Sequence, residues 1–242
     1  MELVTSKGSF CWKDTPPAPL VLLVGGGRRP SSQWLREMSE MSAVWAIDRG
    51  IDICCMASVT PELLIGDADS ASPAAWGWGR SLEVPTIQHP RDKDSTDLQL
   101  ALAELDVRKP GAAVLLTGGL GGRFDHAFSN VFSLQDASGT GAQVLGLADE
   151  TETLFLVAGG QQFTAQFSRR ALAPKIVSLL PLSPVCETVT SRGVHWPLDR
   201  ATLTMGRPAG ICNRLAMGSK QIDVSLGDGL LGVYFCWDEA RL

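Results

Sequence analysis

The amino-acid sequence predicts an α/β N-terminal domain with a mostly parallel sheet, followed by an all-β sandwich C-terminal domain. Up to residue 150, short apolar runs alternate with segments of helical periodicity, which is typical of a parallel sheet with helices on both faces. After residue 150, short β-rich runs follow one another and are divided by Gly, Pro or Asp turns. We therefore expect one domain at residues 1–150 and a second at residues 151–242.

The strands of the first domain are expected where the chain has short, wholly apolar runs. These runs are residues 20–24, 43–47, 63–65 and 112–116. Strands buried on both faces of a parallel sheet have this composition. Two of the runs end directly before Asp48 and Gly66. Asp48 and Asp67 therefore fall just beyond the carboxyl ends of strands, where Rossmann-like sheets bind their ligands.

The helices of the first domain are expected where apolar residues recur at helical spacing, in residues 31–41, 95–105 and 124–134. The expected N-cap is Ser31 or Ser32 in the first helix and Asp94 or Ser95 in the second. Asp97 then lies in the first turn of its helix, from which its carboxylate can face the ligand-binding edge of the sheet.

The second domain is expected to contain only strands. Its β-rich runs are residues 153–157, 162–167, 175–180, 186–191, 201–205, 219–226 and 231–237. They are short and closely spaced, as in a sandwich of antiparallel strands.

The composition indicates a globular protein that is not a general nucleic-acid binder. Hydrophobic residues make up 45% of the 242 residues and charged residues 19%, and the formal net charge is -5. No run of Lys or Arg favours nucleic acid, and no apolar run approaches the roughly 20 residues that span a bilayer. The six cysteines lack zinc-ligand spacing. We expect reduced thiols and a soluble cytoplasmic protein.

One acidic segment directly follows the predicted strand at residues 63–65, and a second leads into the predicted helix at residues 95–105. They are residues 66–70 (Gly-Asp-Ala-Asp-Ser) and residues 93–97 (Lys-Asp-Ser-Thr-Asp). Alternating carboxylates can turn toward one hard cation, and oxygen ligands without nearby Cys or His favour Mg²⁺. Asp67 and Asp69 are also common turn residues, and Asp94 is well explained as a helix cap. Convergence of several carboxylates on one sheet edge nevertheless favours a cation, because the carboxylates would otherwise repel one another.

A glycine-rich segment precedes the predicted helix at residues 124–134. Gly118 and Gly119 allow a backbone to approach an anion closely, with amides at a helix start available to it. Arg123 offers a planar donor fork for phosphate oxygens, and Asp125 can orient that fork or hold a substrate group. The glycines are not followed by Gly-Lys-Ser/Thr, so this is no Walker loop. His126 can donate a hydrogen bond in packing and is not expected to act as a base.

The order of these segments resembles the thiamine pyrophosphokinase family, with specific motifs between residues 48 and 130. The resemblance implies that Asp67, Asp69 and Asp97 bind Mg²⁺ and, with Arg123, form the catalytic set. It also implies an ATP site that includes the following residues: Asp48, Lys93, Asp94, Thr96, Gly118, Gly119, Arg123, Asp125 and His126. Lys93 would border the triphosphate, or would simply be solvated.

Two segments of the second domain extend the resemblance. Residues 193–198 and 210–213 match positions where the family has Gly-x-x-aromatic-x-Leu and Ser-Asn motifs. This implies that the second domain, residues 151–242, binds thiamine through Cys212 and Asn213 and takes part in dimerisation. The thiamine site would be assembled between the two domains of different subunits in a homodimer. For Trp196 itself, core packing is the expected role.

The implied reaction transfers the diphosphoryl group of ATP to the hydroxyl of thiamine, giving thiamine diphosphate and AMP. Two departures from the family pattern affect the acceptor: Arg49 replaces a glycine after Asp48, and Cys212 replaces the serine of Ser-Asn. One alternative is therefore a diphosphokinase for another alcohol, such as a hydroxymethylpterin. The other is a non-catalytic nucleotide- or thiamine-binding sensor. A structural interaction protein would leave the order of the motifs unexplained.

Overall fold

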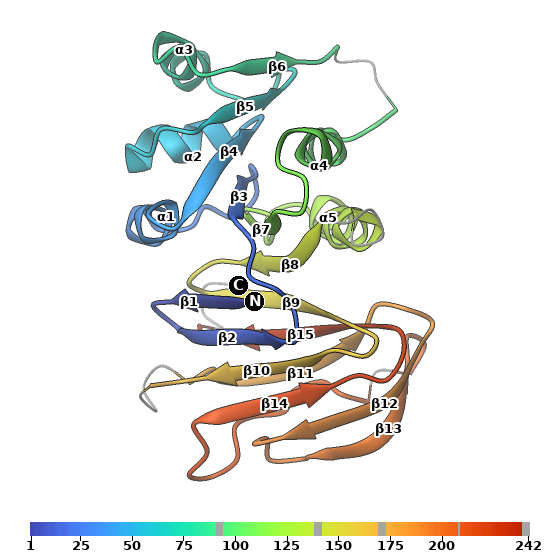
Figure 1. Ribbon diagram of the computed structural model, residues 1–242. Coiled ribbons are helices and arrows are strands. Elements are labelled where there is room, and N and C mark those ends of the chain that lie inside the picture. The colour runs from blue at the N-terminus through green and yellow to red at the C-terminus, as the bar shows by residue number, and fades with distance from the viewer. Residues whose placement is uncertain (91–93, 138–141, 169–172, 208, 239–242) are drawn as a thin grey trace. The chain divides into compact units, whose positions relative to one another are not determined.

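The computed structural model describes residues 1–90, 94–137, 142–168, 173–207 and 209–238 (Figure 1). The chain divides into two compact units, which we call the α/β unit and the β-rich unit. The α/β unit is Ala18–Asp149, and the β-rich unit combines Met1–Pro17 with Glu150–Leu242. The prediction of an α/β domain and a β-rich domain is confirmed at this level.

The first 17 residues belong to a different unit from the one expected. The predicted first domain began at residue 1, whereas β2 (Gly8–Lys13) pairs with β1 (Glu2–Thr5) and with β10 (Gln162–Gln166). Phe10 and Trp12 of β2 are buried. The N-terminal hairpin therefore contributes core side chains to the β-rich unit, which a reading based on chain order does not reveal.

The strands of the α/β unit run parallel in the order β8-β7-β3-β4-β5-β6. They are β3 (Leu20–Val24), β4 (Ser42–Ile47), β5 (Leu63–Gly66), β6 (Thr86–Gln88), β7 (Ala113–Thr117) and β8 (Gln143–Ala148). β3 and β7 are buried along their whole length, which explains their apolar composition. β6 and β8 were not predicted, because β6 has three residues and Gly146 interrupts the apolar run of β8.

Helices cover both faces of this sheet. They are α1 (Ser32–Ser39), α2 (Gly50–Ala57), α3 (Pro73–Ser81), α4 (Asp97–Arg108) and α5 (Phe124–Ala137). Figure 1 shows α1, α2 and α3 on one face and α4 and α5 on the other. The Ser31 hydroxyl accepts a hydrogen bond from the Trp34 N–H at 3.2 Å and caps α1, within the predicted choice. α2 was not predicted because it is largely buried and therefore lacks a regular polar face.

The N-terminus of α4 differs from the prediction of Asp94 or Ser95 as its cap. Thr96 is the N-cap, and its hydroxyl accepts from the Gln99 N–H at 3.2 Å. The Gln99 side chain accepts in return from the Thr96 N–H at 2.9 Å. This reciprocal capping box is a stronger start signal than a lone aspartate, and it makes Asp97 the first helical residue. No helix in the described ranges combines the length and apolar character needed to cross a bilayer.

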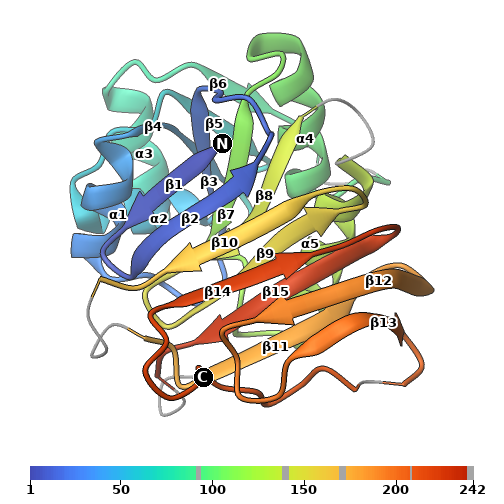
Figure 2. The same ribbon diagram turned by 60° about the horizontal axis from the view of Figure 1, so that its bottom comes forward.

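The β-rich unit contains antiparallel strands in two groups. One group has the order β1-β2-β10-β14-β12-β13, and these strands lie side by side in Figure 2. The other has the order β11-β15-β9. The strands not yet defined are β9 (Glu152–Ala158), β11 (Ile176–Pro181), β12 (Val185–Arg192), β13 (Leu198–Thr204), β14 (Gln221–Ser225) and β15 (Leu230–Cys236).

Aromatic rings from both strand groups form the core of the β-rich unit. The ring of Phe10 lies 4.6 Å from that of Phe155 and 6.0 Å from that of Phe235, between centroids. Phe163 lies 5.7 Å from Phe155. The buried Trp12 indole N–H donates to the Leu156 carbonyl at 2.7 Å, so its polar atom is satisfied inside an apolar core.

Candidate functional site

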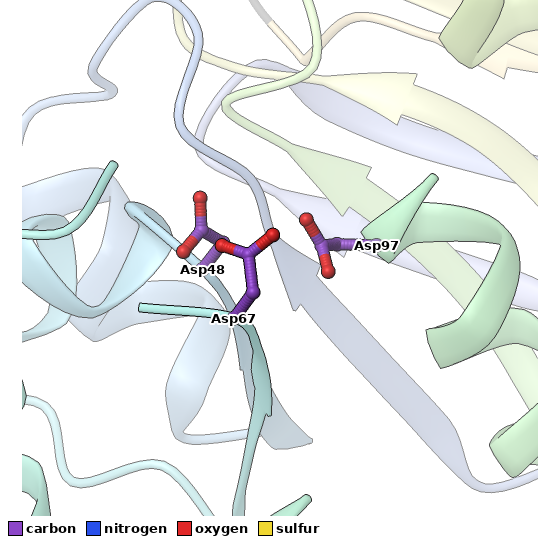
Figure 3. A group of neighbouring side chains, drawn as sticks. All are labelled: Asp48, Asp67 and Asp97. Carbon is purple, nitrogen blue, oxygen red and sulfur yellow. The ribbon is translucent and has the colours of Figure 1, made fainter. Parts of the chain in front are cut away.

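Three carboxylates meet at the carboxyl-end edge of the parallel sheet (Figure 3). Asp48 directly follows β4, Asp67 directly follows β5, and Asp97 begins α4. Each offers one carboxylate oxygen, and these three oxygens lie within 4.8 Å of one another. The sequence predicted that four carboxylates converge on this edge, and the geometry groups three of them, Asp48, Asp67 and Asp97, without Asp69. Figure 3 shows the three carboxylates pointing toward a common space.

The backbone around Asp48 requires glycine at two neighbouring positions. Asp48 itself has a positive φ of 46°, and its N–H donates to the Ile65 carbonyl at 2.7 Å. A Cβ on Gly66 would lie 2.9 Å from the Cα and the Cβ of Asp48, and a Cβ on Gly50 would lie 1.8 Å from the Val24 carbonyl oxygen. The chain therefore folds tightly against itself to present this carboxylate.

The surroundings of Asp48 suit a cation. Its Oδ1 is buried and has no hydrogen-bond partner among the described residues, while its Oδ2 accepts a hydrogen bond from the Ser70 hydroxyl. Burial raises the pKa of the Asp48 carboxyl, the Ser70 hydrogen bond lowers it, and the carboxylates of Asp97 and Asp67 raise it again. A buried oxygen without a donor, close to two further carboxylates, fits the oxygen-ligand set of Mg²⁺.

This group differs from the ligand set that the sequence predicted. The predicted set was Asp67, Asp69 and Asp97, and Asp48 was assigned to ATP alone. In the structure Asp69 is exposed, and its N–H donates to the Asp67 Oδ1 at 3.0 Å. Asp69 thus helps to shape the loop that carries Asp67. The position of Asp48 at a strand end was a visible signal for its membership of the group.

The glycines that follow β3, residues 25–27, lie against the glycine-rich segment that follows β7, residues 118–122. The Gly27 N–H donates to the Gly118 carbonyl at 2.7 Å. A Cβ on Gly118 would lie 2.3 Å from the Gly25 carbonyl oxygen, and one on Gly119 would lie 2.5 Å from a methyl group of Leu116. Close packing within the α/β unit therefore already requires glycine at both positions. ATP binding by Gly118 and Gly119 stays a prediction.

Arg123 and Asp125 form an exposed ion pair at the start of α5. Arg123 directly precedes the helix, and Asp125 lies in its first turn. Arg123 donates to Asp125 twice, at 3.1 Å from Nε and 2.5 Å from Nη2. This hydrogen bonding lowers the pKa of Asp125 and raises the pKa of Arg123. Asp125 thus orients the guanidinium fork of Arg123, which is one of the two roles that the sequence suggested for it. His126 is exposed, so the predicted packing role is not supported by burial.

The remaining predicted residues of the ATP set are placed unevenly. Thr96 caps α4 and Asp94 is exposed, while Lys93 lies outside the described residues. The sequence reading missed Asn130, whose side-chain amide donates to the Gly119 carbonyl at 2.9 Å and ties α5 to the glycine loop. The His89 backbone N–H donates to the Gly66 carbonyl at 3.1 Å and ties the chain after β6 to the end of β5.

A second candidate site lies in the β-rich unit, at the segments that carry Trp196 and Asn213. The Trp196 side chain is 57% exposed, so its predicted role in core packing is wrong. Trp196 follows the turn after β12 and precedes β13, where a side chain can point away from the sheet. Cys212 is also exposed and has a positive φ of 58°. The Cys212 N–H donates to the Ser178 hydroxyl at 3.1 Å.

Comparison with protein families gives two matches. Residues 35–145 match the family model described as "Thiamin pyrophosphokinase, catalytic domain". Residues 166–231 match the model described as "Thiamin pyrophosphokinase, vitamin B1 binding domain". The two matched segments together cover more than half of the chain, and they correspond to the two candidate sites.

Curated relatives carry the same name. Thiamine pyrophosphokinase 1 from Oryza sativa subsp. japonica is 26% identical over 151 residues, which is 60% of this chain and 56% of the rice protein. Thiamine pyrophosphokinase from Bacillus subtilis is 24% identical over 197 residues, which is 80% of this chain and 88% of that protein. The matched region thus spans little more than half the length of the rice relative.

Solved structures share the fold. The thiamine pyrophosphokinase of Bacillus subtilis superposes with a TM-score of 0.76 at 22% identity, covering 90% of this chain and 99% of that one. The yeast thiamin pyrophosphokinase superposes with a TM-score of 0.73 at 14% identity, covering 94% of this chain and 90% of that one.

Proposed function

The chain belongs to the thiamine pyrophosphokinase family, and we propose that it transfers the diphosphoryl group of ATP to the hydroxyl of thiamine. The hydroxyl oxygen attacks the β-phosphorus of ATP. The bond from that phosphorus to the α,β-bridging oxygen breaks, so the products are thiamine diphosphate and AMP. The hydroxyl proton passes to a carboxylate of the acidic group, Asp67 or Asp97.

The observation that carries this proposal is the convergence of Asp48, Asp67 and Asp97 within 4.8 Å at the sheet edge. We propose that these carboxylates hold Mg²⁺. When bound, the ion supplies positive charge to the phosphate oxygens of ATP. The buried and undonated Oδ1 of Asp48 supports its place as a ligand, and Asp69 shapes the same loop.

The donor side of the site is proposed to lie along the glycine loops and the start of α5. We read the order β8-β7-β3-β4-β5-β6 as a Rossmann-like sheet, whose connections reverse direction between β3 and β7. Gly118 and Gly119 lie at that point. Arg123 is proposed to exchange its hydrogen bonds to Asp125 for bonds to phosphate oxygens, because its fork is exposed and already oriented. Nucleotide binding by Lys93, Asp94, Thr96 and His126 belongs to the same proposal.

The acceptor side is proposed to lie at the second candidate site. Trp196 presents an exposed indole, and flat aromatic ligands stack favourably on such a surface. Cys212 and Asn213 lie on the neighbouring segment, with a hydrogen bond between Asn213 and the Trp196 backbone. We propose that this segment binds thiamine. We also propose that the protein acts in the cytoplasm, where ATP and Mg²⁺ are supplied.

We further propose that the chain acts as a homodimer. On α5, Phe124, Phe128 and Phe132 are 79%, 53% and 36% exposed. Their rings contact in series, with centroid separations of 5.7 Å and 4.7 Å. The buried residues of α5 are Ser133, Leu134 and Ala137, so these rings lie on the face turned away from the sheet. A contiguous exposed apolar surface of this kind favours a protein partner.

The test is to incubate the purified chain with ATP, Mg²⁺ and thiamine and to separate the nucleotides by chromatography. We expect AMP and thiamine diphosphate in equal amounts, both dependent on thiamine. ADP in place of AMP would indicate transfer of a single phosphoryl group. AMP only with a hydroxymethylpterin would move the acceptor to another alcohol, and tight ligand binding without any AMP would indicate a sensor.

A further inference from the structure

The exposed ring of Trp196 is contacted by two neighbouring side chains, Arg214 and His195. The Arg214 guanidinium lies over the indole, 5.7 Å from the ring centroid. The His195 ring meets it edge-on, with centroids 4.5 Å apart. Arg214 covers one face of the indole, so the opposite face is the one that a flat ligand can use. A ring that is more than half exposed yet held by two neighbours needs a rigid backbone beneath it.

The side chain of Asn213 supplies that rigidity. Its amide group donates to the Trp196 carbonyl at 2.8 Å, and its amide oxygen accepts from the Trp196 N–H at 3.2 Å. The same oxygen accepts from the Arg214 N–H at 2.9 Å. The Asn213 side chain therefore pairs with both the N–H and the carbonyl of Trp196, as the backbone of a neighbouring strand would. It also holds the backbone of Arg214, whose guanidinium covers the indole.

The backbone of Asn213 is itself fixed to the sheet. Its N–H donates to the Val177 carbonyl at 2.8 Å, and its carbonyl accepts from the Val177 N–H at 2.8 Å. Val177 belongs to β11 and is buried. The path from the core to the indole thus runs through three residues: Val177, Asn213 and Trp196.

We propose that Asn213 is a positioning residue, which acts on the acceptor through Trp196 and does not contact it. This rests on the proposed function, in which Trp196 stacks on thiamine. Three of the four hydrogen bonds that the Asn213 side chain can make go to backbone groups, including both that its oxygen can accept. A bound ligand could reach at most one remaining N–H without competing for these bonds. Asn213 is therefore removed from the direct thiamine-binding set that the sequence predicted.

A double-mutant cycle tests this assignment with the full chain. The KM for thiamine is measured from AMP release in the wild type, Asn213→Ala, Trp196→Ala and the double variant. Loss of aromatic stacking is worth up to about tenfold in affinity, so each single variant should raise this KM by up to about tenfold. If Asn213 acts through Trp196, the double variant should be no worse than Trp196→Ala alone. Multiplied effects in the double variant would show direct contact and overturn the proposal.

Hydrogen exchange of the Trp196 amide gives a readout that does not depend on the reaction. In Asn213→Ala this amide loses its acceptor and should exchange faster. Asn213→Asp keeps the acceptor for this amide but sets an oxygen against the Trp196 carbonyl, so it should restore only part of the protection. An unchanged exchange rate in Asn213→Ala would overturn the positioning role. A wild-type chain that releases no AMP with thiamine would instead overturn the proposed function, while the exchange result would still decide the link between Asn213 and Trp196.

Discussion

Gly66 and Asp48 approach each other so closely that a Cβ on Gly66 would fall 2.9 Å from both the Cα and the Cβ of Asp48. Gly66 ends β5 and Asp48 follows β4, two strands that pair in parallel. Gly66 also has a φ of +152°, which L side chains rarely adopt. The glycine that precedes Asp67 thus also sets the position of Asp48, so one residue controls the placement of two carboxylates.

Gly66→Ala should therefore damage both stability and turnover. The added methyl group must displace Asp48, and the backbone strain alone costs about 1–3 kcal/mol. We expect a lower Tm and at least a tenfold loss of AMP release, measured by thermal unfolding and nucleotide chromatography. Gly77→Ala is the matched control, because a Cβ on Gly77 meets nothing within 4 Å and alanine favours the helix. A Gly66→Ala variant as active as this control would contradict the proposed geometry.

Asp48→Asn should stabilise the metal-free protein at neutral pH. Burial raises the folded-state pKa of Asp48 above its ordinary value, so the folded chain binds this proton more tightly than the unfolded chain. The ionised carboxylate then costs stability, and this cost grows as the pH rises from the ordinary pKa of 3.8 through the raised value.

Thermal unfolding in a chelator across this pH range measures the effect. The gain in Tm of Asp48→Asn over the wild type should be large at neutral pH and vanish at acidic pH. Asp199→Asn, at an exposed position of the β-rich unit, is the matched control for the loss of one carboxylate. A variant that melts at or below the wild-type temperature throughout would refute the burial argument.

Asp67→Asn and Asp97→Asn should each reduce turnover by several orders of magnitude without lowering the Tm. Removing one charge relieves repulsion but also removes a proposed ligand for Mg²⁺. Ligand binding raises the Tm by mass action, so the rise in Tm on adding Mg²⁺ should shrink in both variants. Asp69→Asn separates the predicted ligand set from the observed group. It should keep more of the Mg²⁺ response, because Asp69 stands outside the three-carboxylate group.

Arg123→Lys should reduce turnover with almost no change in Tm. The Arg123–Asp125 pair is exposed, and exposed ion pairs contribute little to stability. Lysine keeps the charge but loses the planar fork that can bind two phosphate oxygens. Kinetics with ATP as the varied substrate should show the loss. Arg108→Lys, which alters the ion pair with Glu104 on α4, is the control. Equal activity in the two variants would show that Arg123 does not bind phosphate and is only a surface charge.

Local patterns in the sequence predicted the elements that position the donor site. The apolar runs of β3, β4, β5 and β7 and the acidic residues after two of them were enough to indicate a ligand-binding sheet edge. Contacts between distant segments could not be predicted in this way. The packing of Gly118 against Gly25 and of Gly66 against Asp48 requires the register of neighbouring strands.

The β-rich unit shows the same limit more strongly. Its short strands were found from composition, but the N-terminal hairpin joins β10 across more than 140 residues of chain. Trp196 was assigned to the core because most large aromatic residues are buried. Its backbone is held by hydrogen bonds to Asn213, which lies 17 residues later. Neither fact has a periodic signal in the sequence.

Phe128→Asp should convert a dimer into a monomer. Phe128 is the central ring of the exposed series on α5 and touches both Phe124 and Phe132, so a charge here interrupts the whole apolar surface. Val107 of α4 is 78% exposed, and Val107→Asp introduces the same charge elsewhere on the α/β unit as a control. Sedimentation velocity should give a dimer for the wild type and for Val107→Asp, and a monomer for Phe128→Asp. Because the side chain of Phe128 is exposed, the variant should still fold, and its Tm should fall only by the contribution of the lost dimer contact. A wild-type monomer, or a Phe128→Asp dimer, would show that this surface does not bind a second copy.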